Sequence, residues 1–286
     1  MSLPVLPLHR NHSRFWRENK FVYPVLSRRS LGISIGLNLN PDKICNFDCI
    51  YCQVNRRSEA ETKFVERDRM LAELDQLLAF VTSGEIYNDE NFQSVPTELR
   101  RLNDIAFSGD GEPTTYRNFD EIVCDVAELK AFHNLDTVKM ILITNASMFH
   151  RPVVEKALKT FDQNQGEIWA KLEAGSEEYY QQVERTTIPF SRILENIAIA
   201  AKVRPIVIQS LFMRIDGLPP TSHEIDAFCN RLNGIVERGG VIQTVQIYTV
   251  ARHPAESKVT SLLQDEVNEI ADEVVAQTAL NVERFY

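Results

Sequence analysis

The sequence has 286 residues, of which 44% are hydrophobic and 25% are charged. These proportions are typical of globular proteins and exclude disorder, collagen and coiled coil as descriptions of the whole chain. No apolar run approaches the roughly 20 residues that a membrane span needs. The first residues also lack the apolar stretch of a secretory signal. We therefore expect a soluble, cytoplasmic protein with no membrane partner.

The net charge is −9, from 31 basic and 40 acidic side chains. An acidic protein is not suited to hold a nucleic-acid backbone by charge alone, so nucleic acid is a less favoured partner. One segment departs from this balance. Residues 1–29 carry six basic side chains against the single acidic Glu18: Arg10, Arg14, Arg17, Lys20, Arg28 and Arg29. A solvated terminal segment is favoured over a phosphate-contacting patch.

Short apolar runs recur along the chain and read as near-continuous Val, Ile, Leu and Phe. The predicted strands are residues 32–37, 104–108, 138–144, 167–173, 206–212 and 241–249. Continuous rather than alternating hydrophobicity is typical of parallel strands that are covered on both faces.

Amphipathic stretches with helical spacing fill the gaps between these runs. The predicted helices include residues 71–81, 122–129, 153–158, 191–198, 222–236 and 260–276. Ser222 is a suitable N-cap for the fifth of them. Cys124 and Cys229 fall on apolar helix faces, where we expect buried core residues.

Six strands alternating with six helices predict repeated βα units, and such units form a parallel sheet, either open or barrel-like. The predicted fold class is therefore α/β. No change in composition divides the chain, so we expect one domain over residues 1–286. Residues 84–103 are expected to form a polar loop, and residues 1–31 and 278–286 to be additions to the sheet.

The cysteines are unevenly placed. Three of the five, Cys45, Cys49 and Cys52, follow the first predicted strand with the spacing C-x3-C-x2-C. Clustered thiols without a secretion signal indicate a metal site rather than disulfides. Two sites fit: structural zinc, with a fourth ligand from His9, His12 or elsewhere, or a [4Fe–4S] cluster with one iron open to a ligand that is not protein.

A second motif, Ser-Gly-Asp-Gly-Glu-Pro-Thr, begins where the second predicted strand ends. Its glycines, Gly109 and Gly111, allow the backbone to approach a ligand closely. The carboxylate of Glu112, which precedes Pro113, is suited to neutralise an ammonium group. The alternative is an ordinary turn between a strand and a helix.

Polar residues also stand at later strand ends. Asn145 follows the third predicted strand, while Lys171 and Glu173 are two apart on the fourth and therefore share a face. A bound zwitterion would give them partners, and so would an ion pair that seals the sheet. Five later residues fit a pocket wall and core hydrogen bonds equally well: Gln209, Ser210, Gln246, Tyr248 and Arg252.

The cysteine segment, with the aromatic Tyr51 directly before the last cysteine, resembles the cluster-binding loop of the radical S-adenosylmethionine (SAM) superfamily. Residues 23–36 also resemble a subgroup of Fe–S oxidoreductases related to the tRNA wyosine-base synthases. This resemblance implies a partial (β/α)6 barrel over about residues 32–277, with the cluster in the loop after the first strand.

The resemblance also implies roles for individual residues. Gly109, Gly111, Glu112 and Pro113 are similar to the family's GGE-type motif, which meets the amino group of SAM, although Asp110 separates the two glycines here. Lys171 is then a candidate for the SAM carboxylate, and Glu173 or Asn145 for the ribose. Arg185 resembles an arginine after the fourth strand of related enzymes, although a surface salt bridge explains it equally well.

By resemblance, a reduced cluster passes one electron to SAM, and the resulting 5′-deoxyadenosyl radical takes a hydrogen atom from the substrate. Flavodoxin or ferredoxin is the expected reductant. A small molecule or nucleoside is the favoured substrate. Two alternatives stay open: the same chemistry on tRNA or a protein partner, and a zinc-stabilised module without catalytic activity.

Overall fold

The structure is a computed structural model that describes residues 16–60, 62–252, 254 and 256–286. Arg10, Arg14 and the alternative zinc ligands His9 and His12 lie outside the described residues. The chain divides into two compact units. Unit 1 comprises the described parts of Met1–Ile44, Glu59–Leu142 and Pro152–Gly166, and unit 2 comprises those of Cys45–Ser58, Ile143–Arg151 and Glu167–Tyr286. The expectation of one domain over residues 1–286 stays a prediction.

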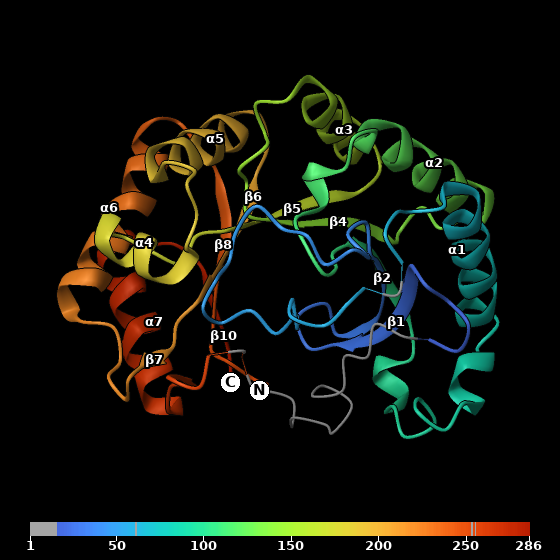
Figure 1. Cartoon of the computed structure of the whole chain (residues 1–286), viewed down its shortest axis with the longest axis horizontal. Helices are drawn as coiled ribbons and strands as arrows, with labels where there is room; N and C mark the ends of the chain where they lie inside the picture. The colour runs from blue at the N-terminus through green and yellow to red at the C-terminus, as the bar shows by residue number, and fades with distance from the viewer. Residues whose placement is uncertain (1–15, 61, 253, 255) are drawn as a thin grey trace. The chain divides into compact units, whose positions relative to one another are not determined.

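Unit 1 holds the first strands in the order β1-β2-β3-β4. They are β1 (Val22–Ser27), β2 (Gly32–Leu37), β3 (Leu102–Phe107) and β4 (Lys139–Thr144), whose last two residues belong to unit 2. The pair β1–β2 is antiparallel and the following pairs are parallel. Figure 1 shows the helices of this unit side by side along the strands: α1 (Arg67–Thr82), α2 (Phe119–Phe132) and α3 (Pro152–Gln163).

Unit 2 continues the alternation with parallel strands in the order β5-β6-β8-β10. They are β5 (Gly166–Lys171), whose first residue belongs to unit 1, β6 (Ile206–Leu211), β8 (Ile242–Tyr248) and β10 (Val282–Phe285). Strands β7 (Arg214–Ile215) and β9 (Val259–Thr260) pair separately and antiparallel. The helices are α4 (Glu177–Glu184), α5 (Phe190–Val203), α6 (Ser222–Glu237) and α7 (Gln264–Thr278), the last of which packs on β8 and β10 (Figure 1).

The α/β class, the six predicted strands and the six predicted helices are confirmed. The segment 278–286, expected to be an addition, contains β10, which extends the sheet beside β8. The N-cap of α6 is Thr221 rather than Ser222, because the Thr221 hydroxyl accepts the N–H of Glu224 at 3.2 Å. The polar loop 84–103 contains two 3₁₀ turns, Glu85–Asn88 and Thr97–Leu99.

The two isolated cysteines differ. Cys229 is buried, as predicted, but Cys124 is exposed. The expectation of a buried Cys124 is wrong because the packed face of α2 is formed by its neighbours Ile122, Val123 and Val126. One residue further along a helix is a rotation of about 100°, which carries the Cys124 side chain out of that face.

A buried carboxylate fixes the segment that leads into β1. Glu73, on α1, accepts the backbone N–H of Lys20 at 3.0 Å and that of Phe21 at 2.9 Å, and it pairs with Arg69 at 2.9 Å. Three charge-compatible donors offset the desolvation of the carboxylate.

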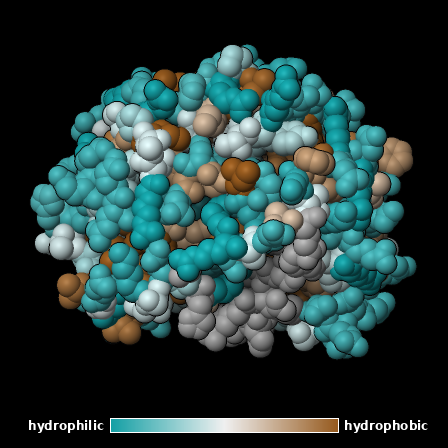
Figure 2. All heavy atoms as spheres, in the orientation of Figure 1, coloured by the Kyte–Doolittle hydropathy of each residue, from teal (hydrophilic) through white to brown (hydrophobic). Residues whose placement is uncertain are grey.

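The surface is ordinary for a globular protein. On the face drawn in Figure 2, hydrophilic side chains predominate and hydrophobic ones are scattered. Within the part of the chain that the structure describes, no helix combines the length and the apolar character that crossing a membrane requires.

Candidate functional site

The cysteine loop, residues 45–52, lies in unit 2. None of its three cysteines forms a disulfide, and each is partly buried. The loop turns tightly where the N–H of Cys52 bonds the carbonyl of Cys49 at 3.0 Å. Its apolar side chains anchor it: Ile50 is fully buried, and the ring of Phe47 meets that of Tyr180 edge-on, with 6.2 Å between centroids. The loop therefore combines buried apolar anchors with cysteines that are only partly buried.

The end of α4 holds the backbone of this loop. The N–H groups of Asp48 and Ile50 bond the carbonyls of Glu184 and Val183, at 3.1 and 2.9 Å. Directly after the helix, the hydroxyl of Thr186 donates to the carbonyl of Asn46 at 2.9 Å. The sequence analysis missed α4, although Ser176 before two glutamates is a recognisable N-cap signal, and its hydroxyl accepts the N–H of Tyr179.

Side-chain amides hold the other side of the loop. Asn145 donates to Oδ1 of Asn46 at 2.9 Å, and Asn46 donates to the hydroxyl of Ser147 at 2.7 Å. That hydroxyl donates back to Asn145 at 2.6 Å. Asn145, predicted as a ribose ligand, is thus buried in a hydrogen-bonded triangle beside Cys45.

Lys171 and Glu173 form an ion pair, with 3.1 Å between Nζ and Oε1. The two side chains meet, although Glu173 lies beyond Lys171, the last residue of β5. The same ammonium lies 3.5 Å from the hydroxyls of Tyr51 and Tyr248, and 5.1 Å from the centre of the Tyr51 ring. Burial disfavours the charged lysine, but the negative charges around it, Glu173 first and then Tyr248, Cys49 and Glu184, together outweigh that effect and hold the pKa of Lys171 above its ordinary value. The structure thus shows the ion pair considered from the sequence.

Cys49 is joined to this pair through a second carboxyl group. Its sulfur lies 2.7 Å from Oε2 of Glu184, and the Glu184 side chain is hydrogen-bonded to Glu173. Burial raises the pKa of the Cys49 thiol, and the charge of Glu184 raises it further. Burial also raises the pKa of Glu184, to which neighbouring Glu173 adds. Sequence reasoning missed Glu184 because it is 135 residues from Cys49.

The other thiols have different neighbours. The sulfur of Cys52 accepts a hydrogen bond from Arg56 at 3.5 Å, and that of Cys45 lies 3.9 Å from Oδ1 of Asn46. Considering only the described residues, no three His, Cys, Asp or Glu side chains form a set that would hold a single metal ion.

Arg185, between α4 and Thr186, has a left-handed backbone with φ of 45°. Its guanidinium pairs with Glu256 at 2.7 Å and lies 4.0 Å from Asp48. Of the two sequence interpretations, the structure shows the partly exposed salt bridge.

The glycine motif lies in unit 1, where both glycines are required by packing. A Cβ at Gly109 would lie 2.3 Å from Oδ1 of Asn38, and one at Gly111 would lie 2.2 Å from the carbonyl oxygen of Ile44. These approaches leave no room for a side chain. Because the two glycines have no side chain, the segment that precedes the cysteine loop packs directly against the motif. The sequence interpretation did not include this packing role.

Glu112 is buried and caps the short 3₁₀ turn Pro113–Thr115. Its Oε1 accepts the N–H of Thr114 at 3.1 Å and the Thr114 hydroxyl at 2.5 Å. The motif thus performs the turn function considered from the sequence, and its contact with an ammonium group stays a prediction.

The strand register shows which of the candidate substrate residues share a face of the sheet. Lys171, Gln209 and Gln246 are direct neighbours on adjacent parallel strands, so their side chains share a face, and Ser210 belongs to the opposite one. Gln209 donates to Gln246 at 2.9 Å, and Gln246 donates to Glu283 of β10 at 3.2 Å. Both glutamines are buried, so the structure shows the core hydrogen bonds considered from the sequence.

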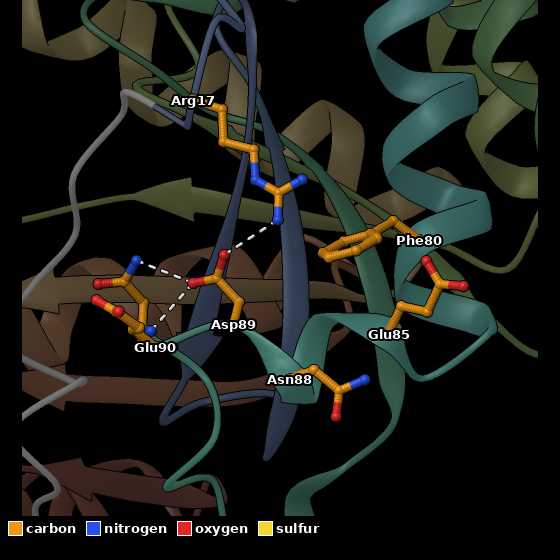
Figure 3. A pocket seen from close by; sticks show the side chains of 7 residues that line it. Arg17, Phe80, Glu85, Asn88, Asp89 and Glu90 are labelled. Atoms are coloured by element: carbon orange, nitrogen blue, oxygen red, sulfur yellow. Dashed lines mark hydrogen bonds and ion pairs between the residues drawn. The ribbon is translucent and has the colours of Figure 1, made fainter.

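A separate hollow of about 640 Å³ lies in unit 1 (Figure 3). Its lining contains none of the predicted site residues. Arg17 pairs with Asp89 at 3.1 Å and lies over the ring of Phe80. Burial opposes ionisation of Asp89, but hydrogen bonds from Asn91 and Arg17 outweigh it and lower its pKa. These polar groups satisfy one another, so we do not place the site there.

Comparison with known proteins gives concordant results. The family model of the radical SAM superfamily matches residues 39–232. A "UPF0026 protein" of Helicobacter pylori (strain ATCC 700392 / 26695) is 28% identical over 252 residues, which are 85% of this chain and 70% of that protein.

Solved structures share the fold. A radical SAM methyltransferase from Sphaerobacter thermophilus superposes with a TM-score of 0.64 at 12% identity, covering 93% of this chain and 69% of the other. SuiB from Streptococcus suis, bound to S-adenosylmethionine, gives 0.56 at 13% identity, covering 90% and 52%. These similarities confirm the partial barrel of parallel βα units.

The family match spans well over half of the chain and includes both the cysteine loop and the glycine motif. The protein is an enzyme whose cofactors are a [4Fe–4S] cluster and SAM. It belongs to the radical SAM superfamily.

Proposed function

We propose that Cys45, Cys49 and Cys52 hold the cluster, and that the enzyme removes a hydrogen atom from a small-molecule or nucleoside substrate. The observation that carries this proposal is the cysteine loop itself. Three cysteines outside any disulfide stand on one tight loop whose backbone and apolar side chains are fixed by neighbouring elements. Thiolates are the ligands that iron–sulfur clusters take, so the donor set fits the group.

The cofactors, the cysteines and the apolar side chains of the loop would have separate roles. When bound, the cluster and SAM supply reductive cleavage of the sulfonium and the radical that abstracts the hydrogen atom. Three cysteines would hold three of the irons, which would leave one coordination position for a ligand other than protein. The buried side chains of Ile50 and Phe47 keep the loop seated, while its three cysteines are only partly buried. The protein's task is to orient reactants and exclude water.

SAM carries an ammonium, a carboxylate and ribose hydroxyls, and the proposed contacts match these groups. Glu112 would take the ammonium beside the backbone of Gly109, Gly111 and Pro113. Lys171 would take the carboxylate, and Glu173 or Asn145 the ribose. Support comes from the chemistry of these side chains and from the 26% of the Lys171 side chain that is exposed. Tyr51 and Arg185 are assigned to this site by resemblance alone.

Charge favours a small substrate over tRNA. The net charge is −9, and two of the basic residues near the start are already paired: Arg17 with Asp89 at 3.1 Å, and Lys20 with Glu66 at 3.9 Å. The tRNA substrate and the zinc-stabilised module become outcomes of the test, and the protein substrate stays an alternative. Flavodoxin or ferredoxin is the proposed reductant, and a cytoplasmic location stays a prediction.

The test is anaerobic reconstitution followed by reduction in the presence of SAM. We expect about four irons and four sulfides per chain, and release of methionine and 5′-deoxyadenosine. Deuterated candidate nucleosides, small molecules and tRNA are then compared for transfer of deuterium into 5′-deoxyadenosine. Stoichiometric zinc without sulfide would instead identify the non-catalytic module, and a loaded, reduced cluster that leaves SAM intact would contradict the proposal.

A further inference from the structure

Cys49 is fixed by α4 on both sides of its own backbone. The N–H groups of its neighbours, Asp48 and Ile50, bond two consecutive carbonyls of that helix. The Cα of Cys49 is therefore placed before the side chain is considered. What remains free is rotation of the sulfur about the Cα–Cβ bond, which has three staggered positions.

The carboxyl group of Glu184 selects one of those positions. It lies on the same helix end and meets the sulfur at 2.7 Å. The Glu184 side chain is in turn hydrogen-bonded to that of Glu173, which forms an ion pair with Lys171 at 3.1 Å. Lys171 lies against Tyr51, two residues after Cys49. The contacts form a closed ring that starts and ends on the cysteine loop, so each member restricts the others.

The sulfur of Cys52 accepts a hydrogen bond from Arg56 at 3.5 Å, and that of Cys45 lies 3.9 Å from Oδ1 of its neighbour Asn46. Cys49 meets the buried side chain of Glu184, on another element, at 2.7 Å. Groups that contact metal ligands from outside orient them, and their loss typically lowers metal affinity 10–100-fold.

We infer that Glu184 is a positioning residue for the cluster, which fixes the sulfur of Cys49 in the orientation that receives iron. This inference rests on the proposed function, since it assumes that Cys49 is a cluster ligand. Glu184 touches neither SAM nor substrate in this role. It acts through Cys49, and through the ring that joins Glu173, Lys171 and Tyr51.

The experiment compares Glu184→Ala and Glu184→Gln with the control Glu178→Ala, an exposed glutamate in the first turn of the same helix. Each protein is reconstituted anaerobically, and its iron content, the rate of iron loss to a chelator and the electron paramagnetic resonance spectrum of the reduced cluster are measured. Circular dichroism checks that each variant is folded. If Glu184→Ala does not fold, Glu184→Leu, which fills the space without hydrogen bonding, replaces it.

We expect Glu184→Ala to lose iron about tenfold faster or more, and to show a broadened or shifted spectrum. Glutamine offers a donor and an acceptor at the same length, so Glu184→Gln should restore slow loss, and Glu178→Ala should match the unsubstituted protein. Unchanged iron loss and spectrum in folded Glu184→Ala would overturn the inference alone. If the unsubstituted protein takes up no iron and sulfide, the proposed function fails and the inference fails with it.

Discussion

The ammonium nitrogen of Lys171 lies 5.1 Å from the centre of the Tyr51 ring. One cation therefore connects strand β5 to the cysteine loop, because Tyr51 stands directly before Cys52. The contact also places a positive charge next to the buried carboxylate of Glu173. Cation–π contacts contribute on the order of 1 kcal/mol, so the larger consequence of losing Lys171 concerns Glu173.

We expect Lys171→Met to lower the free energy of unfolding by about 3 kcal/mol, because it leaves an uncompensated carboxylate in the interior. This is the low end of the usual range, since 26% of the Lys171 side chain is exposed. Urea unfolding followed by circular dichroism measures the change. Lys202→Met, at an exposed position in the last turn of α5, should change stability by less than about 0.5 kcal/mol. Coincident unfolding curves for both variants would show that the pair contributes nothing.

Glu266, at the start of α7, should make stability depend on pH. Burial disfavours its ionisation, but hydrogen bonds from Arg214 at 2.6 Å and from the N–H of Leu263 outweigh this and hold its pKa below the ordinary 4.5. A pKa that is lower in the folded state gives stability that is present above pH 4.5 and lost as the pH falls through the folded value.

Glu266→Gln should therefore destabilise the protein at pH 7 and have a smaller effect at pH 3. The measurement is the difference in unfolding free energy between the two proteins at each pH. An equal difference at both pH values would contradict the assignment of this pH dependence to Glu266.

The pairing of Lys171 with Glu173 could be anticipated from the sequence, and that of Cys49 with Glu184 could not. Residues two apart on a strand share a face whatever the tertiary fold, so local geometry was sufficient for the first pair. The second pair joins residues 135 apart, and its helix, α4, has only eight residues. Nothing periodic in the sequence specifies which helix end meets the cysteine loop.

The same distinction applies to the fold. The central strands were predictable because each is a continuous apolar run, as in residues 206–212. Strand β10 is four residues long with two charged members, and β1 contains Pro24, which is typical of edge strands. Both are edge elements whose pairing depends on the rest of the sheet, so their sequences carry little signal.

Gly111 offers a test of the packing beside the cysteine loop. Gly111→Ala would place a Cβ 2.2 Å from the carbonyl oxygen of Ile44, and a backbone atom cannot move aside cheaply. We expect a loss of about 1–3 kcal/mol in unfolding free energy. Gly234→Ala is the matched control, since its Cβ meets nothing within 4 Å in α6, and it should stabilise by about 0.5–1 kcal/mol. Thermal unfolding of both variants gives the comparison, and a Gly111→Ala protein as stable as Gly234→Ala would contradict the packing argument.

The last prediction separates cluster ligands from bystanders among the five cysteines. Cys45→Ala, Cys49→Ala and Cys52→Ala should each abolish the four-iron cluster, because two thiolates on one loop do not hold it firmly. Cys124→Ala should keep both iron and stability, since Cys124 is exposed, and its effect should stay within about 0.5 kcal/mol. Cys229→Ala should also keep iron while losing about 1–2 kcal/mol, the expected loss for a small buried side chain.

Iron and sulfide per folded chain, measured side by side for the five variants, test this assignment. The exposed position of Cys124 makes the test more stringent, because an exposed thiol could bind the cluster if a fourth protein ligand were needed. Iron loss from folded Cys124→Ala or Cys229→Ala would reveal a fourth protein ligand. A fourth ligand would close the coordination position that SAM requires, so this single result would contradict the proposed chemistry while leaving the fold and the packing of the cysteine loop unaffected.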